Sequence, residues 1–174
     1  MFQQFGLAVE AWPIAVALRG SIWLYPLVNI AHLLGIAFLI GCIVSLDLRL
    51  LGLWPHQPWQ SLAIVLRPMA VVGLVLAIGS GLLLFVARAA DYTANPLFLV
   101  KLGLVVLGIA NAIWLGRSDS WRQAISRKLA TGSSNVANPG SNRGPIRWPL
   151  RLAAGLSLTF WISALVLGRL VGYR

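Results

Sequence analysis

Residues 23–46 read WLYPLVNIAHLLGIAFLIGCIVSL, an apolar run whose only ionisable side chains are Tyr25, His32 and Cys42. A helix that crosses a bilayer needs roughly 20 predominantly apolar residues, so this run is long enough to span a membrane. Three further runs, 68–87, 96–116 and 149–171, are similarly apolar. These four runs decide the fold that the sequence predicts.

The composition supports a membrane protein. Mean hydropathy is +0.82 and only 10% of the residues are charged, whereas about 25% are charged in an ordinary soluble domain. A spanning β-barrel would need short alternating segments, and the four runs are continuous. The sequence therefore predicts an all-α, integral membrane four-helix bundle.

One membrane domain accounts for residues 1–174. Residues 1–20 hold only a short apolar stretch interrupted by Pro13, so we expect an interfacial helix with Trp12 at headgroup depth instead of a fifth span. Residues 117–148 are basic at first and then rich in Gly, Ser, Asn and Pro, which indicates a flexible loop.

The net charge of +10 reports orientation more than nucleic-acid binding, because the basic residues flank the spans and form no stripe interleaved with aromatics. One side of the membrane receives nine of them: Arg49, Arg67, Arg117, Arg122, Arg127, Lys128, Arg143, Arg147 and Arg151. The other side receives five: Arg19, Arg88, Lys101, Arg169 and Arg174. The positive-inside rule then places the side with nine basic residues in the cytoplasm and predicts that both termini face outward, which is the periplasm for a protein of the bacterial inner membrane. We expect the lipid bilayer as the main partner and no nucleic-acid partner.

His32 shares one helix face with Tyr25, Asn29, Gly35, Leu39 and Cys42, since these positions fall at spacings of three, four or seven residues. Polar residues of a membrane helix normally face the bundle interior. By helical rise, His32 lies about 13 Å and Lys101 about 7 Å below the periplasmic boundary, where Arg88 ends the second span. The sequence thus predicts that these residues gather in the periplasmic half of the bundle.

This set of residues fits a b-type haem, whose iron binds a neutral imidazole and whose propionates bind Arg or Lys. His32 would be the iron ligand, and Lys101, Arg88, Asn29 and Tyr25 would contact the cofactor. Two alternatives stay open: His32 has a purely structural role, or it belongs to a proton path or binds another ligand. His56 lies on the cytoplasmic side by this topology, so it cannot be a second ligand of the same iron.

Other positions carry structural expectations. Gly73, Ala77 and Gly81 recur every four residues and form a ridge that either packs against another helix or leaves space for a flat cofactor. Asn111 is expected to make an interhelical hydrogen bond. Asp47 is expected to pair with a basic residue of another span, with Arg67 as one candidate.

The stretches LYPLVNIAHLLGIAFLIGCIVSLDLRLLG (24–52) and NPLFLVKLGLVVLGIANA (95–112) resemble an uncharacterised bacterial family of four-helix membrane proteins, domain of unknown function 6644. The resemblance covers about residues 11–112. The layout is also similar, more distantly, to HemJ-type protoporphyrinogen oxidases and CopD-like copper proteins. The HemJ-type resemblance implies haem b at His32 and Lys101. The histidine expected near the end of the third span is replaced here by NAIWLGR (111–117), so no second haem ligand is implied.

These observations favour a haem-b or porphyrin protein that transfers electrons, with a redox partner or a second copy of the chain as its expected partner. A non-catalytic membrane subunit or scaffold is one alternative, and a small transporter is another. Copper transport has little support, because Cu(I) prefers sulfur ligands and the chain has two methionines and one cysteine. The sequence does not decide whether the protein is an enzyme.

Overall fold

The computed structural model describes residues 2–119, 121–123, 125–126 and 148–171. Its helices are α1 (Phe2–Glu10), α2 (Pro13–Gly20), α3 (Leu24–Leu51), α4 (Trp59–Ala87), α5 (Ala89–Ala94), α6 (Pro96–Arg117) and α8 (Trp148–Val171). None of the described residues lies in a strand. The all-α fold class is therefore confirmed.

Helices α3, α4, α6 and α8 are each long and apolar enough to cross a membrane. Their apolar side chains also point outward: Val72, Val75 and Val106 are 67%, 66% and 63% exposed. Surfaces this apolar match the hydrocarbon of a bilayer, which is the solvent that such helices require. The chain is a multi-pass membrane protein built as a four-helix bundle.

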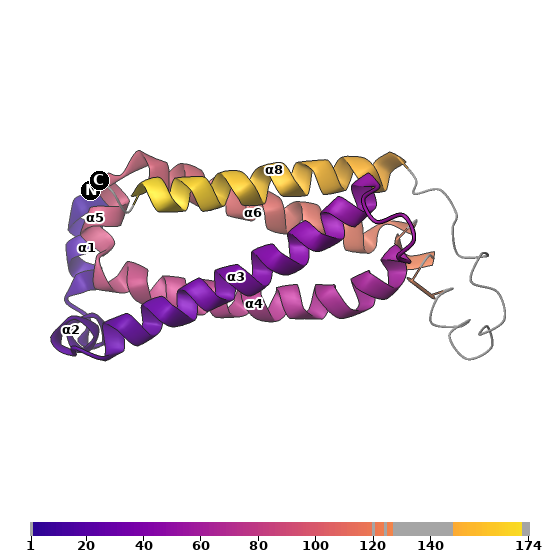
Figure 1. The fold of residues 1–174 in the computed structure, drawn as a ribbon. Coiled ribbons are helices and arrows are strands. Elements are labelled where there is room, and N and C mark those ends of the chain that lie inside the picture. The colour runs from indigo at the N-terminus through magenta and orange to yellow at the C-terminus, as the bar shows by residue number, and fades with distance from the viewer. Residues whose placement is uncertain (1, 120, 124, 127–147, 172–174) are drawn as a thin grey trace.

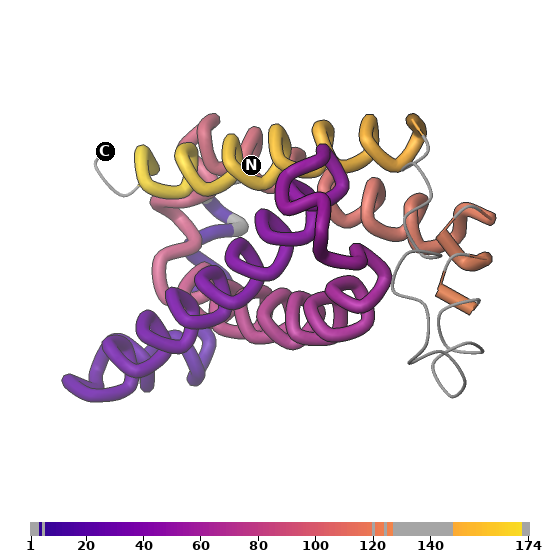
Figure 2. Tube along the Cα trace, turned by 45° about the vertical axis from the view of Figure 1, so that its right-hand side comes forward, coloured from indigo at the N-terminus to yellow at the C-terminus, as the bar shows by residue number. Residues whose placement is uncertain are grey.

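The long helices form two pairs. In Figure 1, α3 starts beside α4 and crosses diagonally to reach α8 at the other end, while α6 runs along α8. The tube in Figure 2 shows the same crossing of α3 from α4 to α8. In the described residues, α4 forms no extended contact with α6 or with α8. The two pairs are joined through α3 and α8, and through the short helices at the opposite end.

We call the end of the bundle that carries α1, α2 and α5 the α5 end, and the end that carries the α3–α4 turn the Trp59 end (Figure 1). A cluster of buried apolar residues lies at the Trp59 end and consists of Leu50, Trp59, Ala63, Trp121, Leu150 and Ala154. Arg151 adds a hydrogen bond from α8 to the carbonyl oxygen of Leu51, at 2.8 Å. This core closes the bundle at the Trp59 end.

The α3–α4 contact is built from small residues. A Cβ atom at Gly35 would lie 2.6 Å from the backbone nitrogen of Ala77, and one at Gly73 would lie 2.6 Å from the backbone nitrogen of Leu39. Only residues without a side chain allow two backbones to approach this closely. The packing interpretation of the Gly73 and Ala77 positions is thus confirmed, because both face α3.

The α6–α8 contact also uses a glycine. A Cβ atom at Gly108 would lie 2.9 Å from the Trp161 ring, so the indole of α8 occupies the space that Gly108 leaves on α6. Asn111 Nδ2 donates to the carbonyl oxygen of Ala153 at 2.9 Å. The predicted interhelical hydrogen bond of Asn111 is therefore confirmed.

Three details differ from the sequence expectations. The N-terminal segment forms two helices, because Pro13 begins α2 and Trp12 before it is extended, with ψ at 146°. Helix α3 continues past residue 46 to Leu51, and α4 begins at Trp59 and carries Pro68 inside it. Burial of Leu50, Trp59 and Ala63 in the Trp59-end core stabilises these extra turns. The loop predicted over 117–148 lies largely outside the described residues.

The expected pairing of Asp47 is wrong for the described residues. The ion pair that they contain joins Arg19 to Glu10, and Arg67 lies over the ring of Trp121 at 5.8 Å. Asp47 instead faces Ser157 of α8, because α3 crosses onto α8 at this end.

Candidate functional site

His32 lies half-buried on α3 at its contact with α4. Its Nδ1 atom is 2.9 Å from the carbonyl oxygen of Ala77 and 3.3 Å from Ser80 Oγ. A carbonyl oxygen can only accept a hydrogen bond, so Nδ1 must carry the proton and donate. The neutral imidazole then has its free lone pair on Nε2. No described residue makes a hydrogen bond to Nε2.

The absence of a side chain at Gly81 leaves space for the His32 imidazole. A Cβ atom at Gly81 would lie 3.0 Å from His32 Cε1 and 3.3 Å from Nδ1, closer than most real contacts. The ridge of α4 therefore has two roles along its length. Gly73 and Ala77 allow the backbones to meet, and Gly81 accommodates the histidine ring.

Lys101 lies half-buried on α6, against α8. A Cβ atom at Gly168 would be 3.2 Å from Lys101 Nζ, so the lysine side chain runs over the glycine. Lys101 is near enough to His32 for its positive charge to act on the imidazole. In the described part of the chain, Lys101 makes no ion pair. Even a half-buried ammonium group without an anion is costly in an apolar medium.

Aromatic rings gather beside these groups at the α5 end. Phe85, Tyr92 and Phe98 stack with centroid separations of 5.1–6.3 Å. Burial raises the pKa of the Tyr92 hydroxyl, and nearby Tyr25 raises it further, whereas the charge of Arg88 lowers it. Tyr25 and Arg88 thus both lie near Tyr92.

Sequence reasoning missed this aromatic cluster, because its three rings come from α4, α5 and α6 and follow no helical period. A signal for it did exist, since aromatic residues near the ends of spans tend to gather at the membrane interface.

The structure brings together only part of the predicted set. Gly35, Leu39 and Cys42 on the His32 face are buried, and Tyr25 is half-buried. Asn29 is exposed and makes no hydrogen bond in the described residues, and Arg88 is exposed at the C-terminal end of α4. His32 and Lys101 therefore form the centre of the candidate site, and Arg88 lies at its rim.

His56 is exposed in the turn between α3 and α4, at the Trp59 end. The described residues contain no group of three His, Cys, Asp or Glu side chains that could hold a metal ion. A haem iron needs no such group, because the porphyrin supplies four ligands and the protein one or two. The donor set at the α5 end, one neutral imidazole with nearby cations, fits that requirement.

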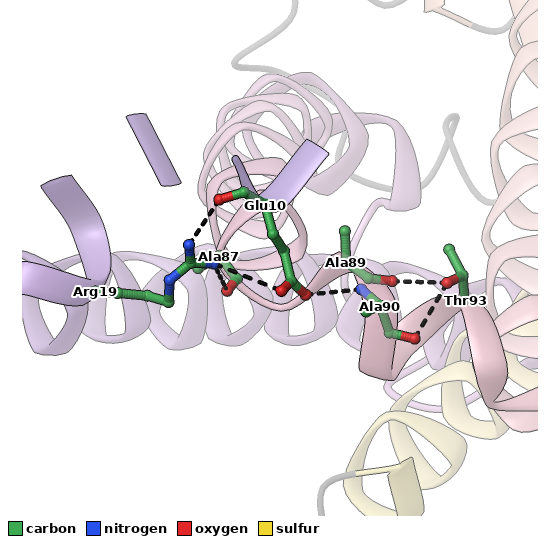
Figure 3. Close-up of polar contacts among 6 residues, drawn as sticks. All are labelled: Glu10, Arg19, Ala87, Ala89, Ala90 and Thr93. Atoms are coloured by element: carbon green, nitrogen blue, oxygen red, sulfur yellow. Dashed lines mark hydrogen bonds and ion pairs between the residues drawn. The ribbon is translucent and has the colours of Figure 1, made fainter. Parts of the chain in front are cut away.

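The N-terminal helices cover the α5 end. Figure 3 shows Arg19 reaching across Glu10 and Ala87, and the Glu10 carboxylate reaching Ala90. Arg19 donates to the carbonyl oxygens of Glu10 and Ala87 at 2.6 and 3.0 Å, and Glu10 Oε1 accepts from the Ala90 N–H at 2.8 Å. Gly6 permits the close approach, since its Cβ would lie 2.6 Å from Ala90 Cα. These contacts fix α1 and α2 to the junction of α4 and α5.

Comparison with known proteins gives no match: no family model, no curated protein and no solved structure matches this chain. The resemblances drawn from the sequence therefore stay predictions.

Proposed function

We propose that this membrane protein binds haem b, or a porphyrin, at the α5 end of the bundle and uses it for electron transfer. His32 Nε2 would hold the iron, and Lys101 and Arg88 would bind the propionates. The bound group would supply a reversible one-electron couple. The residues of this chain would orient the ligand and balance its charge.

The hydrogen bond from His32 Nδ1 to the Ala77 carbonyl carries the proposal. Histidines that bind a metal almost always donate their second ring N–H to a carbonyl or carboxylate, which fixes the tautomer and makes the ligating nitrogen more basic. The hydrogen bond from His32 Nδ1 to the Ala77 carbonyl oxygen is of this kind. Its Nε2 is the nitrogen left for a ligand.

The charge balance supports an anionic ligand. The whole chain has four acidic residues, Glu10, Asp47, Asp91 and Asp119. Glu10 is engaged by Arg19 and the Ala90 N–H, and Asp47 lies at the Trp59 end. Asp91 and Asp119 are exposed. No carboxylate in the described residues neutralises Lys101, whereas a propionate would.

The donor set favours one protein ligand to the iron. The other histidine, His56, lies in the α3–α4 turn at the opposite end of the bundle, and Met69 lies in the half of α4 nearer that turn. A second ligand to the iron would therefore be a water molecule, Lys101, or a residue of a redox partner or second copy of the chain. The nine-to-five distribution of basic residues supports a periplasmic α5 end in a bacterial inner membrane.

Absorption spectroscopy tests the proposal. Protein purified from membranes of a haem-replete host should show a Soret band that sharpens and shifts on reduction with dithionite. His32→Ala should abolish the band, and His56→Ala should leave it unchanged as the matched control. Lys101→Ala should weaken haem retention or shift the reduction potential. A colourless protein that also fails to take up added hemin would contradict the proposal.

A structural role for His32 is the second candidate, and the same hydrogen bond favours it, because it joins α3 to α4. In that case the protein would be a non-catalytic membrane subunit or scaffold. His32→Ala would then lower the melting temperature of a protein that never carried a Soret band. The absorption spectrum and the melting temperature together distinguish a haem-binding role of His32 from a structural one.

A further inference from the structure

Asp47 is a buried carboxyl group within a membrane helix, at the opposite end from the candidate haem site. It lies on the last turn but one of α3, and only 4% of the residue is exposed. Its Oδ2 atom is enclosed and has no hydrogen-bond partner. Ionisable groups in such positions are costly, and they generally mark a path for protons or ions.

The polar neighbour of this carboxyl group is the hydroxyl of Ser157 on α8. Ser157 is also buried, at 9% exposure. One turn further along the same face of α8, the indole N–H of Trp161 is buried without a partner. The contact between α3 and α8 thus encloses a carboxyl and a hydroxyl, whereas the Trp161 indole lies against Gly108 of α6.

The arginines at this end are engaged elsewhere. Arg49 donates to the carbonyl oxygens of Pro55 and Gln57, and Arg151 donates to that of Leu51. Arg67 of α4 lies over Trp121.

The remaining groups at this end do not neutralise Asp47 either. Gln60 of α4 has an enclosed Oε1 without a partner, and Arg117 and Asp119 beyond α6 are exposed. Among the described residues, Asp47 makes no ion pair.

A carboxylate in this setting can be neutralised by a proton or by a metal cation. A hard cation such as Na⁺ or Ca²⁺ needs several oxygen ligands, and the described residues here offer the Asp47 carboxyl and the Ser157 hydroxyl. A proton binds to the carboxylate itself, and the O–H of the resulting acid needs only one hydrogen-bond acceptor, which the hydroxyl provides. The two-group arrangement therefore fits a proton.

We propose that Asp47 and Ser157 form a proton-binding site between α3 and α8. The Asp47 carboxylate takes up one proton from water at the Trp59 end to become a carboxylic acid, and it returns the proton to the same side. Ser157 hydrogen-bonds to the acid. The site does not depend on the proposed haem, because it lies on different residues at the other end of the bundle.

A hydrophobic carbodiimide tests the site on the full-length wild-type protein. The acid adds across one C=N bond of the reagent to give an O-acylisourea, and in a dry site this rearranges to a stable N-acylurea. Peptide mass spectrometry should find the adduct on Asp47, and the yield should fall as the pH rises, because only the protonated acid reacts. Asp91 and Asp119, which are exposed, serve as internal controls and should not form the stable adduct. No adduct at Asp47 at any pH would overturn the proposal.

Two further measurements identify the ligand. Infrared spectra should contain the C=O stretch of a protonated acid that Asp47→Asn removes. Ser157→Ala should move this band to higher frequency, because a hydrogen bond is lost, and the exposed control Thr159→Ala should not.

If Na⁺, compared with choline at the same pH and ionic strength, protects Asp47 from the carbodiimide, the site binds a metal cation and the proton assignment is wrong. A wild-type spectrum without the Asp47 band would also contradict it.

Discussion

His32 Nδ1 lies 2.9 Å from the carbonyl oxygen of Ala77, across the interface at which α3 and α4 approach each other most closely. One bond therefore determines the tautomer of the imidazole and also joins two spans. Because of this double role, a substitution at His32 can affect both helix packing and the site.

Gly81→Ala should disturb the imidazole, whereas Gly79→Ala should not. The new methyl at position 81 would lie 3.0 Å from His32 Cε1, while position 79 has open space around it. We expect weaker haem retention, measured by the Soret absorbance per protein, for Gly81→Ala alone. Equal retention in the two variants would mean that the ring does not depend on the glycine.

Gly35→Ala should destabilise the bundle, because its methyl would collide with the backbone of Ala77 at 2.6 Å. Overpacking of this kind typically costs about 1–3 kcal/mol. Gly41→Ala on the same helix meets no atom and should remain close to wild type. Thermal melting in detergent measures the difference, and Ala77→Leu should be destabilising for the same reason as Gly35→Ala. Identical melting of the Gly35 and Gly41 variants would refute the close α3–α4 contact.

His32→Ala should lower the free energy of unfolding by about 0.5–1.5 kcal/mol in the absence of any cofactor, the usual net value of one hydrogen bond. Ser80 contributes to the same contact, since its hydroxyl is 3.3 Å from Nδ1. A double-mutant cycle with Ser80→Ala should therefore show coupling between the two positions. Strict additivity would indicate that Ser80 plays no part in holding the ring.

Glu10→Ala should release α1 from α5. The Ala90 N–H would lose its acceptor, and Arg19 would lose its ion pair of 3.7 Å. Since this pair is partly exposed, the effect on global stability should be at most about 1 kcal/mol. Hydrogen exchange of the Ala90 amide should nevertheless become faster. Glu10→Gln keeps an acceptor oxygen and should retain more protection than Glu10→Ala.

The orientation in the membrane can be checked with reporter fusions. The nine-to-five charge asymmetry predicts that a reporter active only in the periplasm works when fused after Arg174 and fails when fused after Ser134. The opposite pattern would place the α5 end, with His32, on the cytoplasmic side.

The sequence by itself determined the fold class. Continuous apolar runs can satisfy their backbone hydrogen bonds in lipid only as helices, so hydropathy predicts the spans directly. Local chemistry also set some helix ends: Asn95 accepts from the Leu97 N–H and Pro96 starts α6, as the Asn-Pro pair indicates. The periodicity around His32 correctly placed Gly35, Leu39 and Cys42 on a buried face.

The tertiary structure alone decided which helices meet. No repeat along a single span shows that α3 leaves α4 to cross onto α8, or that Asp47 therefore faces Ser157 and not Arg67. The bond between Glu10 and Ala90 joins residues 80 positions apart. Interhelical contacts in a membrane depend on small gaps and single polar atoms that match between helices, and these leave little periodic signal in either helix.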